Sequence, residues 1–364
     1  MSEMWIHMGP QHPMTHGLWN LRVKVDGETI TDAEPELGYL HRSVEKLGER
    51  RKFFMNTTLT DRLCYASAMT WSHCYVQTVE ELMGVEVPTR AEYTRVITLE
   101  LQRIASHLMW MGAFMPDLGL MTGFLYGFRD REMFLNLLEI PSGGRMLYNY
   151  MRVGGVKRDL PTGYAGKTER VLKTMEKRLN EYENLYDSSK IFRMRTQDVG
   201  KIKDSDAKNW GITGPNIRGC GVPFDIRKTD TYSIYEELDW EPQTASAGNG
   251  WGDCYSRYRV RFNEIQESIN IIRQALEKRP DGPIMASKVP VRTEGTAFRR
   301  TEDSRGEALM YVVGDGTDRP YRWKIKSPMF TTVSASPNFL KGYKIADIPA
   351  IMGSIDMCIG ETDK

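Results

Sequence analysis

The chain has 364 residues, with 49 Lys and Arg against 48 Asp and Glu, and its formal net charge is +1. This balance argues against a nucleic-acid-binding protein, because such proteins usually carry a marked basic excess. The sequence contains no stretch of roughly 20 apolar residues and no pattern typical of a signal peptide. Its five cysteines form no CxxC motif, which argues against a disulfide framework or a zinc finger. We therefore expect a soluble chain in a reducing compartment.

The segment HMGPQHPMTHG, residues 7–17, is unusually rich in histidine, proline and glycine. Proline fixes φ and glycine adds conformational freedom, so this segment predicts a shaped loop and not a helix or a central strand. Its three histidines suit two roles, metal ligation and proton transfer near neutral pH. The absence of an HExxH motif and of paired cysteines weakens the metal interpretation.

The next elements are a hairpin and two buried helices. Alternating apolar residues from Leu18 onward, with Asp26-Gly27 as the turn, predict a two-stranded ribbon. A largely buried helix is predicted from a cap at Asp61 to Gly84. Apolar residues three and four positions apart predict a second core helix over residues 93–112.

Two amphipathic helices and another hairpin follow. Residues 167–187 and 255–278 each carry apolar side chains on one helical face, and residues 308–328 have the alternation of a hairpin. The sequence thus predicts an α+β fold, in which small antiparallel sheets flank a helical bundle core. We expect one domain over residues 1–364, with an N-terminal β-ribbon at about 1–55, a helical core at about 56–285 and a C-terminal α+β part at about 286–364.

Two features bear on chemistry before any resemblance is considered. The nucleotide-binding patterns GxGxxG and GxxxxGK[ST] are absent, so a nucleotide bound by this chain alone is not supported. Asp117 lies in an apolar stretch after Pro116, where a carboxylate must be paired or its pKa rises through desolvation. It either caps the following helix or pairs with a histidine, and its spacing does not decide between these roles.

Seven motifs taken in order resemble one family: GPQHPMTHG, ELGYLHRSVEKL, RVITLELQRIASHLMWMG, FLYGFRDRE, NYMRVGGVKRDLP, GITGPNIRGCGVPFDIRK and IMGSIDMCIGETDK. They are similar to the NuoD/NdhH family, the quinone-site subunit of complex I, over about residues 8–364. That family is itself related to the large subunit of nickel-iron hydrogenases. The resemblance implies a hydrogenase-large-subunit-like fold and a head-group site between this chain and a small iron-sulfur subunit.

The resemblance also assigns site residues. It implies catalytic roles for His16, Tyr65 and Asp117, with Asp117 as the partner of His16. The residues implied to contact the carrier or to lie near the cluster are His12, Thr15, Gly17, Arg42 and Met121.

The implied chemistry fits these residue types. Reduction of a quinone or phenazine takes two electrons and two protons, so hydrogen-bond donors must already face the ring. Tyr65, with an ordinary pKa of about 10, and His16, with one of about 6.5, are suitable donors, and Asp117 would stabilise the imidazolium.

The resemblance implies a subunit of an NADH:quinone-type or a deazaflavin- or ferredoxin-dependent carrier oxidoreductase that translocates protons. The chain would bind no cofactor alone; its substrate would be quinone or methanophenazine, and the iron-sulfur cluster would lie in the adjacent subunit. The implied partners are NuoB-type, NuoC-type and NuoI-type subunits and a membrane NuoH-type subunit. The implied location is the peripheral arm at the cytoplasmic face of the membrane. No nucleic-acid partner is implied.

Two departures from related sequences matter. Hydrogenases bind nickel and iron through two CxxC motifs, but the equivalent stretches here begin at Cys64 and Cys358 and end at Ser67 and Glu361. This donor set matches a four-thiolate soft site poorly, so we expect no metal. A hydrogenase-type module and a non-catalytic scaffold remain as alternatives. Many relatives that use a high-potential quinone have a histidine where this chain has Leu147, which predicts a low-potential carrier, menaquinone or methanophenazine.

Overall fold

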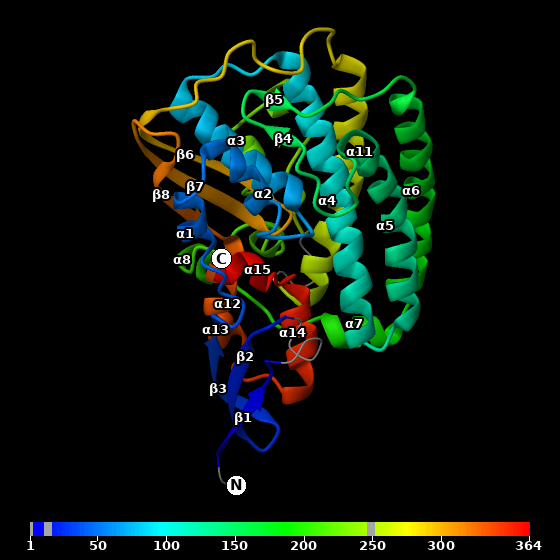
Figure 1. The fold of residues 1–364 in the computed structure, drawn as a ribbon. Helices are drawn as coiled ribbons and strands as arrows, with labels where there is room; N and C mark the ends of the chain where they lie inside the picture. The colour runs from blue at the N-terminus through cyan, green and yellow to red at the C-terminus, as the bar shows by residue number, and fades with distance from the viewer. Residues whose placement is uncertain (1–2, 11–16, 246–251) are drawn as a thin grey trace.

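The computed structural model describes residues 3–10, 17–245 and 252–364, and in them small antiparallel sheets flank a bundle of long helices (Figure 1). The predicted α+β fold with a helical core is confirmed. None of the helices in these ranges is long and apolar enough to cross a membrane.

The strands form three sheets, ordered β1-β2-β3, β4-β5 and β6-β7-β8. Their bounds are β1 Met4–Met8, β2 Asn20–Asp26, β3 Thr29–Glu36, β4 Met151–Arg152, β5 Gly155–Val156, β6 Glu294–Asp303, β7 Gly306–Asp315 and β8 Pro320–Lys326. The α-helices are α1 Val44–Glu49, α2 Thr57–Thr60, α3 Ala68–Met83, α4 Thr89–Asp117, α5 Met121–Ser142, α6 Tyr164–Tyr186, α7 Lys190–Thr196, α8 Asp204–Asn209, α9 Pro215–Arg218, α10 Ile226–Thr229, α11 Cys254–Lys278, α12 Pro328–Ser334, α13 Ser336–Leu340, α14 Ile348–Ser354 and α15 Ile359–Asp363.

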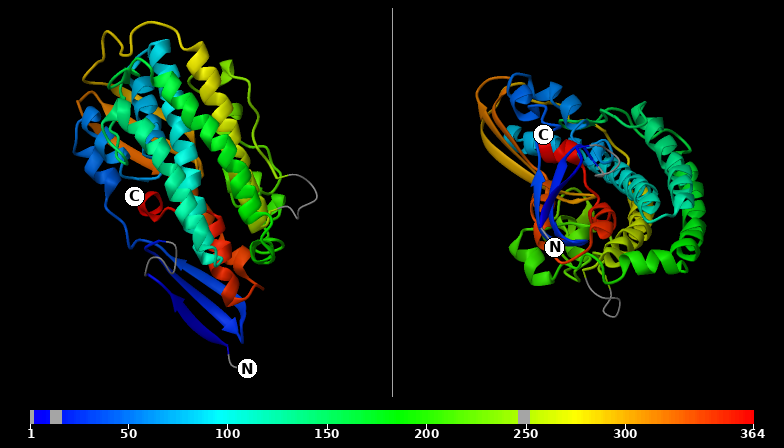
Figure 2. Two further views of the ribbon diagram at one scale, coloured as in Figure 1. Left: turned by 90° about the vertical axis from the view of Figure 1, so that its right-hand side faces the viewer. Right: turned by 90° about the horizontal axis from the view of Figure 1, so that it is seen from below.

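The bundle is built on α4, which packs against both α5 and α11 (Figure 2). Helices α4 and α5 approach each other at two glycines: a Cβ on Gly127 would lie 2.8 Å from the Leu108 carbonyl oxygen and 2.9 Å from the Gly112 Cα. Any side chain at Gly127 would push the two backbones apart. The two helices therefore pack nearly backbone to backbone, which fixes where the end of α4, at Asp117, is placed.

The two predicted amphipathic helices are confirmed as α6 and α11, which contact each other. Their apolar faces are buried as the periodicity predicts, with Leu172 and Met175 fully buried on α6 and Ile265 and Ile269 on α11. Helix α11 begins where the Asp253 carboxylate accepts a hydrogen bond of 2.7 Å from the Ser256 backbone N–H, which satisfies one free donor of the first turn.

The N-terminal sheet extends from one end of the molecule (Figure 2). The predicted hairpin around Asp26-Gly27 is confirmed as β2 and β3, but the sheet has three strands and not two. Strand β1 pairs antiparallel with the free edge of β2, from Met4 opposite Val25 to Met8 opposite Leu21. Its sequence, MWIHM, has no polar and apolar alternation, and therefore the periodicity did not predict it.

The helix predicted from Asp61 begins seven residues later, at Ala68, although its end at Gly84 is confirmed. The Asp61 carboxylate caps no helix; it accepts hydrogen bonds from the Ser72 hydroxyl and from the Asn149 backbone N–H. Residues 61–67 therefore form a loop, held in place from two sides. Cys64 and Tyr65 lie in this loop.

The C-terminal part begins with a sheet covered by α3 and ends inside the molecule. The predicted hairpin is confirmed as β7 and β8, with β6 as an additional neighbour of β7. Trp323 and Ile325 are buried, whereas Tyr321 is largely exposed. After α12, α13 and α14 the chain returns to the centre of the molecule, where α15 lies between the sheet and the helical bundle (Figure 1).

Candidate functional site

The last turn of the chain, α15, is where segments far apart in sequence meet. The Asp363 carboxylate accepts hydrogen bonds from the backbone N–H groups of Gly38, at 2.9 Å, and Leu40, at 2.8 Å. Arg42 donates from Nη2 to the Gly360 carbonyl oxygen at 2.9 Å. The segment after β3 is thus fixed against α15.

Two glycines allow the other segments to come equally close. A Cβ on Gly360 would lie 2.7 Å from the Leu63 carbonyl oxygen, and a Cβ on Gly17 would lie 2.6 Å from Cγ1 of Ile359. Both distances are shorter than a side chain tolerates, so both positions require glycine. As a result, the end of the opening segment and the loop with Tyr65 both contact α15.

Tyr65 is the most exposed of the predicted proton donors in the described residues. It follows the buried Cys64, yet 49% of its own surface is exposed. Desolvation of the phenol raises its pKa above the ordinary value. Its hydroxyl has no hydrogen-bond partner within residues 3–10, 17–245 and 252–364. A protonated phenol is therefore available to a molecule bound there.

Asp117 is the last residue of α4 and lies against α14. Its Oδ2 is 3.4 Å from where a Cβ on Gly353 would lie, and Trp110 Nε1 donates to the Gly353 carbonyl oxygen at 2.8 Å. The interpretation of Asp117 as a helix cap is wrong, because the residue before α5 is Leu120. The half-buried carboxylate is held at the junction between the bundle and the C-terminal helices.

The structure places the remaining predicted residues as follows. His12, Thr15 and His16 lie outside the described residues. Met121 begins α5 and is 63% exposed, and Leu147 follows α5 and is 38% exposed. The structure therefore brings Gly17, Arg42 and Tyr65 together at α15, and places Asp117 at α14.

The sequence did not predict the tip of the β6–β7 hairpin as part of the site. Asp303, Ser304 and Arg305 form this tip and are almost fully buried. Arg305 Nη2 contacts Asp356 Oδ1 at 2.9 Å, and its charge acts on Cys64 and Cys358. Charged residues beside a turn normally predict a solvent-exposed tip, and sequence pattern gives no sign that this one is inserted into the core.

A larger buried charge cluster, which we call the Arg218 network, includes Glu302 of the same hairpin. Arg218 donates from Nε to Glu264 Oε1 at 2.8 Å and from Nη1 to Glu302 Oε1 at 2.7 Å. Its guanidinium also lies 3.3 Å from Asp225, and His107 bonds Glu264 at 2.8 Å. Burial lowers the pKa of His107, so its imidazole is neutral at neutral pH. His107 therefore holds no exchangeable extra proton for the network at that pH.

The chain matches known proteins along its whole length. The model of the family described as respiratory-chain NADH dehydrogenase, 49 kDa subunit, matches residues 117–294 and 288–364. The chain is 43% identical over 371 residues to the D subunit of F(420)H(2) dehydrogenase from Methanosarcina mazei, covering 100% of this chain and 98% of the relative. It is 46% identical over 362 residues to the D subunit of NADH-quinone oxidoreductase from Dehalococcoides mccartyi, covering 99% and 98%. It is also 44% identical over 366 residues to the same-named protein of Geobacillus kaustophilus, covering 100% and 98%.

Proposed function

The chain belongs to the family of the 49 kDa subunit of respiratory-chain NADH dehydrogenase, and from this membership we propose that it holds the head group of a membrane quinone or methanophenazine while the carrier is reduced. The observation that carries the proposal is Tyr65, a half-exposed phenol with a raised pKa and no hydrogen-bond partner in the described part of the chain. It lies where three segments meet at α15.

Tyr65 would donate a hydrogen bond to a carbonyl or ring-nitrogen atom of the carrier. As electrons arrive, that atom gains basicity and draws the phenolic proton, which the raised pKa keeps on the oxygen until then. The loop that carries Tyr65 is fixed by Asp61 and by the contact between Leu63 and Gly360, so the donor is already in place before the carrier binds.

His16 and Asp117 would supply the second proton. We propose that the Asp117 carboxylate orients and stabilises the protonated imidazole of His16, which is recharged from solvent. Support comes from Gly17, the residue that follows His16 in the sequence. Gly17 lies against Ile359 of α15, and Asp117 lies against Gly353 of α14, so both contact the C-terminal helices.

As a family member, the chain is a subunit of an oxidoreductase complex. We propose a small NuoB-type iron-sulfur subunit as the neighbour that delivers electrons, with Arg42, Met121 and Leu147 facing it because all three are exposed in this chain. NuoC-type, NuoI-type and membrane NuoH-type subunits would complete the peripheral arm and its attachment to the cytoplasmic face of the membrane. His12 and Thr15 would line the carrier site.

Tyr65→Phe in the assembled complex tests this function. Removal of one hydroxyl leaves the ring and its packing, so the complex should assemble while carrier reduction falls by about 100-fold or more, the usual contribution of a positioned proton donor. Turnover is measured with the native carrier. Electron transfer to a soluble acceptor that reacts before the carrier site should be unchanged.

Tyr321→Phe is the matched control, because Tyr321 is 69% exposed on β8 and takes part in none of the contacts at α15 described above. It should keep full turnover. If Tyr65→Phe also keeps most of the wild-type carrier reduction, Tyr65 is not the donor and the proposal fails.

A further inference from the structure

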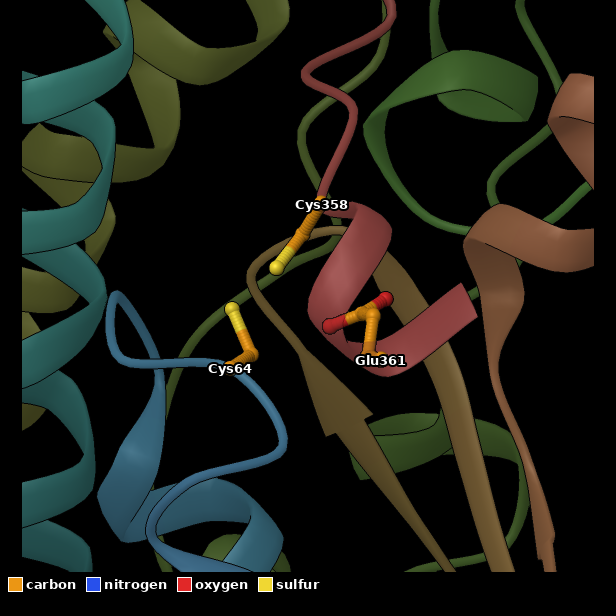
Figure 3. Close-up of side chains that lie close together, drawn as sticks. All are labelled: Cys64, Cys358 and Glu361. Carbon is orange, nitrogen blue, oxygen red and sulfur yellow. The ribbon is translucent and has the colours of Figure 1, made fainter. Parts of the chain in front are cut away.

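Two cysteines and a glutamate from opposite ends of the chain form a buried cluster beside Tyr65, which we call the Cys64 cluster (Figure 3). Its members are Cys64, in the loop before α3, and Cys358 and Glu361 at α15. One sulfur or oxygen atom from each lies within 4.8 Å of the others, and the two sulfur atoms point toward each other. The side chains are nearly or fully shielded from solvent.

The spacing of these donors suits a small tetrahedral ion. Zinc-sulfur and zinc-oxygen bonds of about 2.3 and 2.1 Å place tetrahedral ligand atoms roughly 3.6 to 3.8 Å apart. Shifts of the cysteine and glutamate side chains by an ångström or less would close the cluster to that size. Two thiolates and one carboxylate form a borderline-soft set, which zinc accepts and which leaves its fourth position open.

The surroundings of the cluster carry more acidic groups than basic ones. Arg305 is the cation whose charge acts on Cys64, Cys358 and Glu361, and it already bonds Asp356. Oδ1 of Asp303 and Oδ2 of Asp356 are buried and have no hydrogen-bond partner in the described part of the chain. Unpartnered buried carboxylate oxygens are costly, and a nearby divalent cation would offset that cost.

The carboxylate of Glu361 is oriented as a metal ligand usually is. Trp71 donates from Nε1 to Oε2 at 3.1 Å, and Ser327 donates from its hydroxyl to Oε1 at 2.9 Å. Each oxygen keeps a second lone pair for an ion. Hydrogen bonds to ligating carboxylates of this kind fix their direction and strengthen metal sites.

We propose that Cys64, Cys358 and Glu361 bind one zinc-class divalent ion, which ties α15 to the loop that carries Tyr65. Binding releases the protons held by these groups and changes no oxidation state. The site differs from a nickel-iron centre, which needs four thiolates. It departs from our expectation that this donor set binds no metal, because that expectation compared Cys64, Cys358 and Glu361 only with a four-thiolate site. It does not depend on the proposed carrier reduction.

The alternative use of two neighbouring cysteines is a redox-active disulfide. Forming that bond would require a two-electron oxidant, whereas metal binding changes no oxidation state, and the test below distinguishes the two outcomes.

The test uses the purified complex, reduced and stripped with a chelator, then incubated with zinc and freed of excess ion. We expect one zinc per chain by elemental analysis, and a thiolate-to-cobalt absorption band when cobalt(II) replaces zinc. Cys64→Ser and Cys358→Ser should each weaken zinc binding by about 100-fold or more and abolish the band. Cys220→Ser is the control: the Cys220 thiol donates to the Asn216 carbonyl oxygen at 3.3 Å, as a serine hydroxyl can, and metal binding should be unchanged.

Glu361→Gln gives a second variant in case a cysteine variant fails to assemble, and it should weaken zinc binding while the cobalt-thiolate band persists. The proposal is overturned if the reduced wild-type complex takes up no zinc, or if its zinc and cobalt signals survive in Cys64→Ser and Cys358→Ser. Peptide mapping that shows a Cys64–Cys358 disulfide, with no zinc uptake after its reduction, would assign the pair to redox chemistry instead.

Discussion

The Arg218 network and the region around Tyr65 are both rich in charge, but they differ in how the charges are satisfied. In the Arg218 network one guanidinium contacts Glu264 and Glu302 at bonding distance, and all three groups are almost fully buried. Even Arg218 Nη2, which lacks a well-directed hydrogen bond, lies 2.7 Å from Glu264 Oε1. Around Tyr65, in contrast, the phenol is half exposed, and within the described residues neither it nor one carboxylate oxygen each of Asp303 and Asp356 has a hydrogen-bond partner.

The difference distinguishes charged groups that stabilise the fold from polar groups that can react or bind. Paired charges in the core fix α9, α11 and β6 relative to one another, because a displaced partner would leave a bare charge in a medium of low dielectric. Polar groups that the fold leaves without partners remain available to a substrate, a proton or an ion. We therefore expect variants of the network to affect stability and variants near Tyr65 to affect turnover.

The largest effect should follow from breaking the network. Arg218→Met removes the cation that faces three buried carboxylates, those of Asp225, Glu264 and Glu302. Loss of one partner from a buried ion pair costs about 3 to 5 kcal/mol, so the free energy of unfolding should fall by that amount. Urea unfolding of the full-length chain measures it.

Arg322→Met is the matched control, because Arg322 is about half exposed and its partner Glu49, at 3.2 Å, keeps a second cation, Lys46, at 2.7 Å. An ion pair with one exposed member contributes about 0 to 1 kcal/mol. Equal losses in the two variants would mean that the Arg218 network does not hold the core together, and the contrast between the two regions would fail.

A smaller effect depends on pH and concerns Glu302. Burial, and then the negative charge of Asp225, raise the pKa of Glu302 from 4.5 to about 7, against the opposing effect of Arg218. A carboxyl whose pKa is raised on folding binds its proton more tightly in the folded chain, so it costs stability as pH rises from 4.5 to about 7, by up to about 1.4 kcal/mol per pH unit.

Glu302→Gln removes this titration. We expect the variant to gain stability relative to the wild type between pH 5 and pH 7, and the difference to level off above pH 7. Urea unfolding at each pH gives the comparison. If the plots of unfolding free energy against pH are parallel for the two proteins, Glu302 has an ordinary pKa in the folded chain. Its negative charge would then cost the folded chain no stability.

The sequence predicted four long helices, α3, α4, α6 and α11, and two hairpins because these depend on local periodicity, as in α6, where residues three and four positions apart share one face. It did not predict the bounds of the long helix α5. It did not predict contacts between distant residues. Arg218 meets Glu302 across 84 positions, and Trp71 meets Glu361 across 290, with no spacing in the sequence to indicate either. Arg305 was missed for a related reason: a hairpin tip is normally exposed, and only the packing of Thr213 and Gly214 against Gly306 shows that this one is inserted.

The smallest effect concerns the potential of the neighbouring cluster and the choice of carrier. A protonated imidazole roughly 6 Å from a cluster, at an effective dielectric near 20, would favour the reduced cluster by about 3 kcal/mol, on the order of a tenth of a volt. Leu147 cannot take a proton, so we propose a lower-potential cluster and a low-potential carrier, menaquinone or methanophenazine.

Leu147→His tests this with redox titrations of the cluster in the complex from about pH 6 to pH 8. Leu147 is 38% exposed in the chain alone. If water stays around residue 147 in the complex, it screens the imidazolium charge, and the shift in cluster potential should be only a few tens of millivolts. The variant should have a raised potential at pH 6 that falls toward the wild-type value at pH 8, whereas Leu147→Gln, equally polar but not titratable, should follow the wild type. If the wild-type potential itself falls steeply with pH, a titrating group other than residue 147 already sets it, such as a base on a partner subunit, and Leu147 no longer argues for a low-potential carrier.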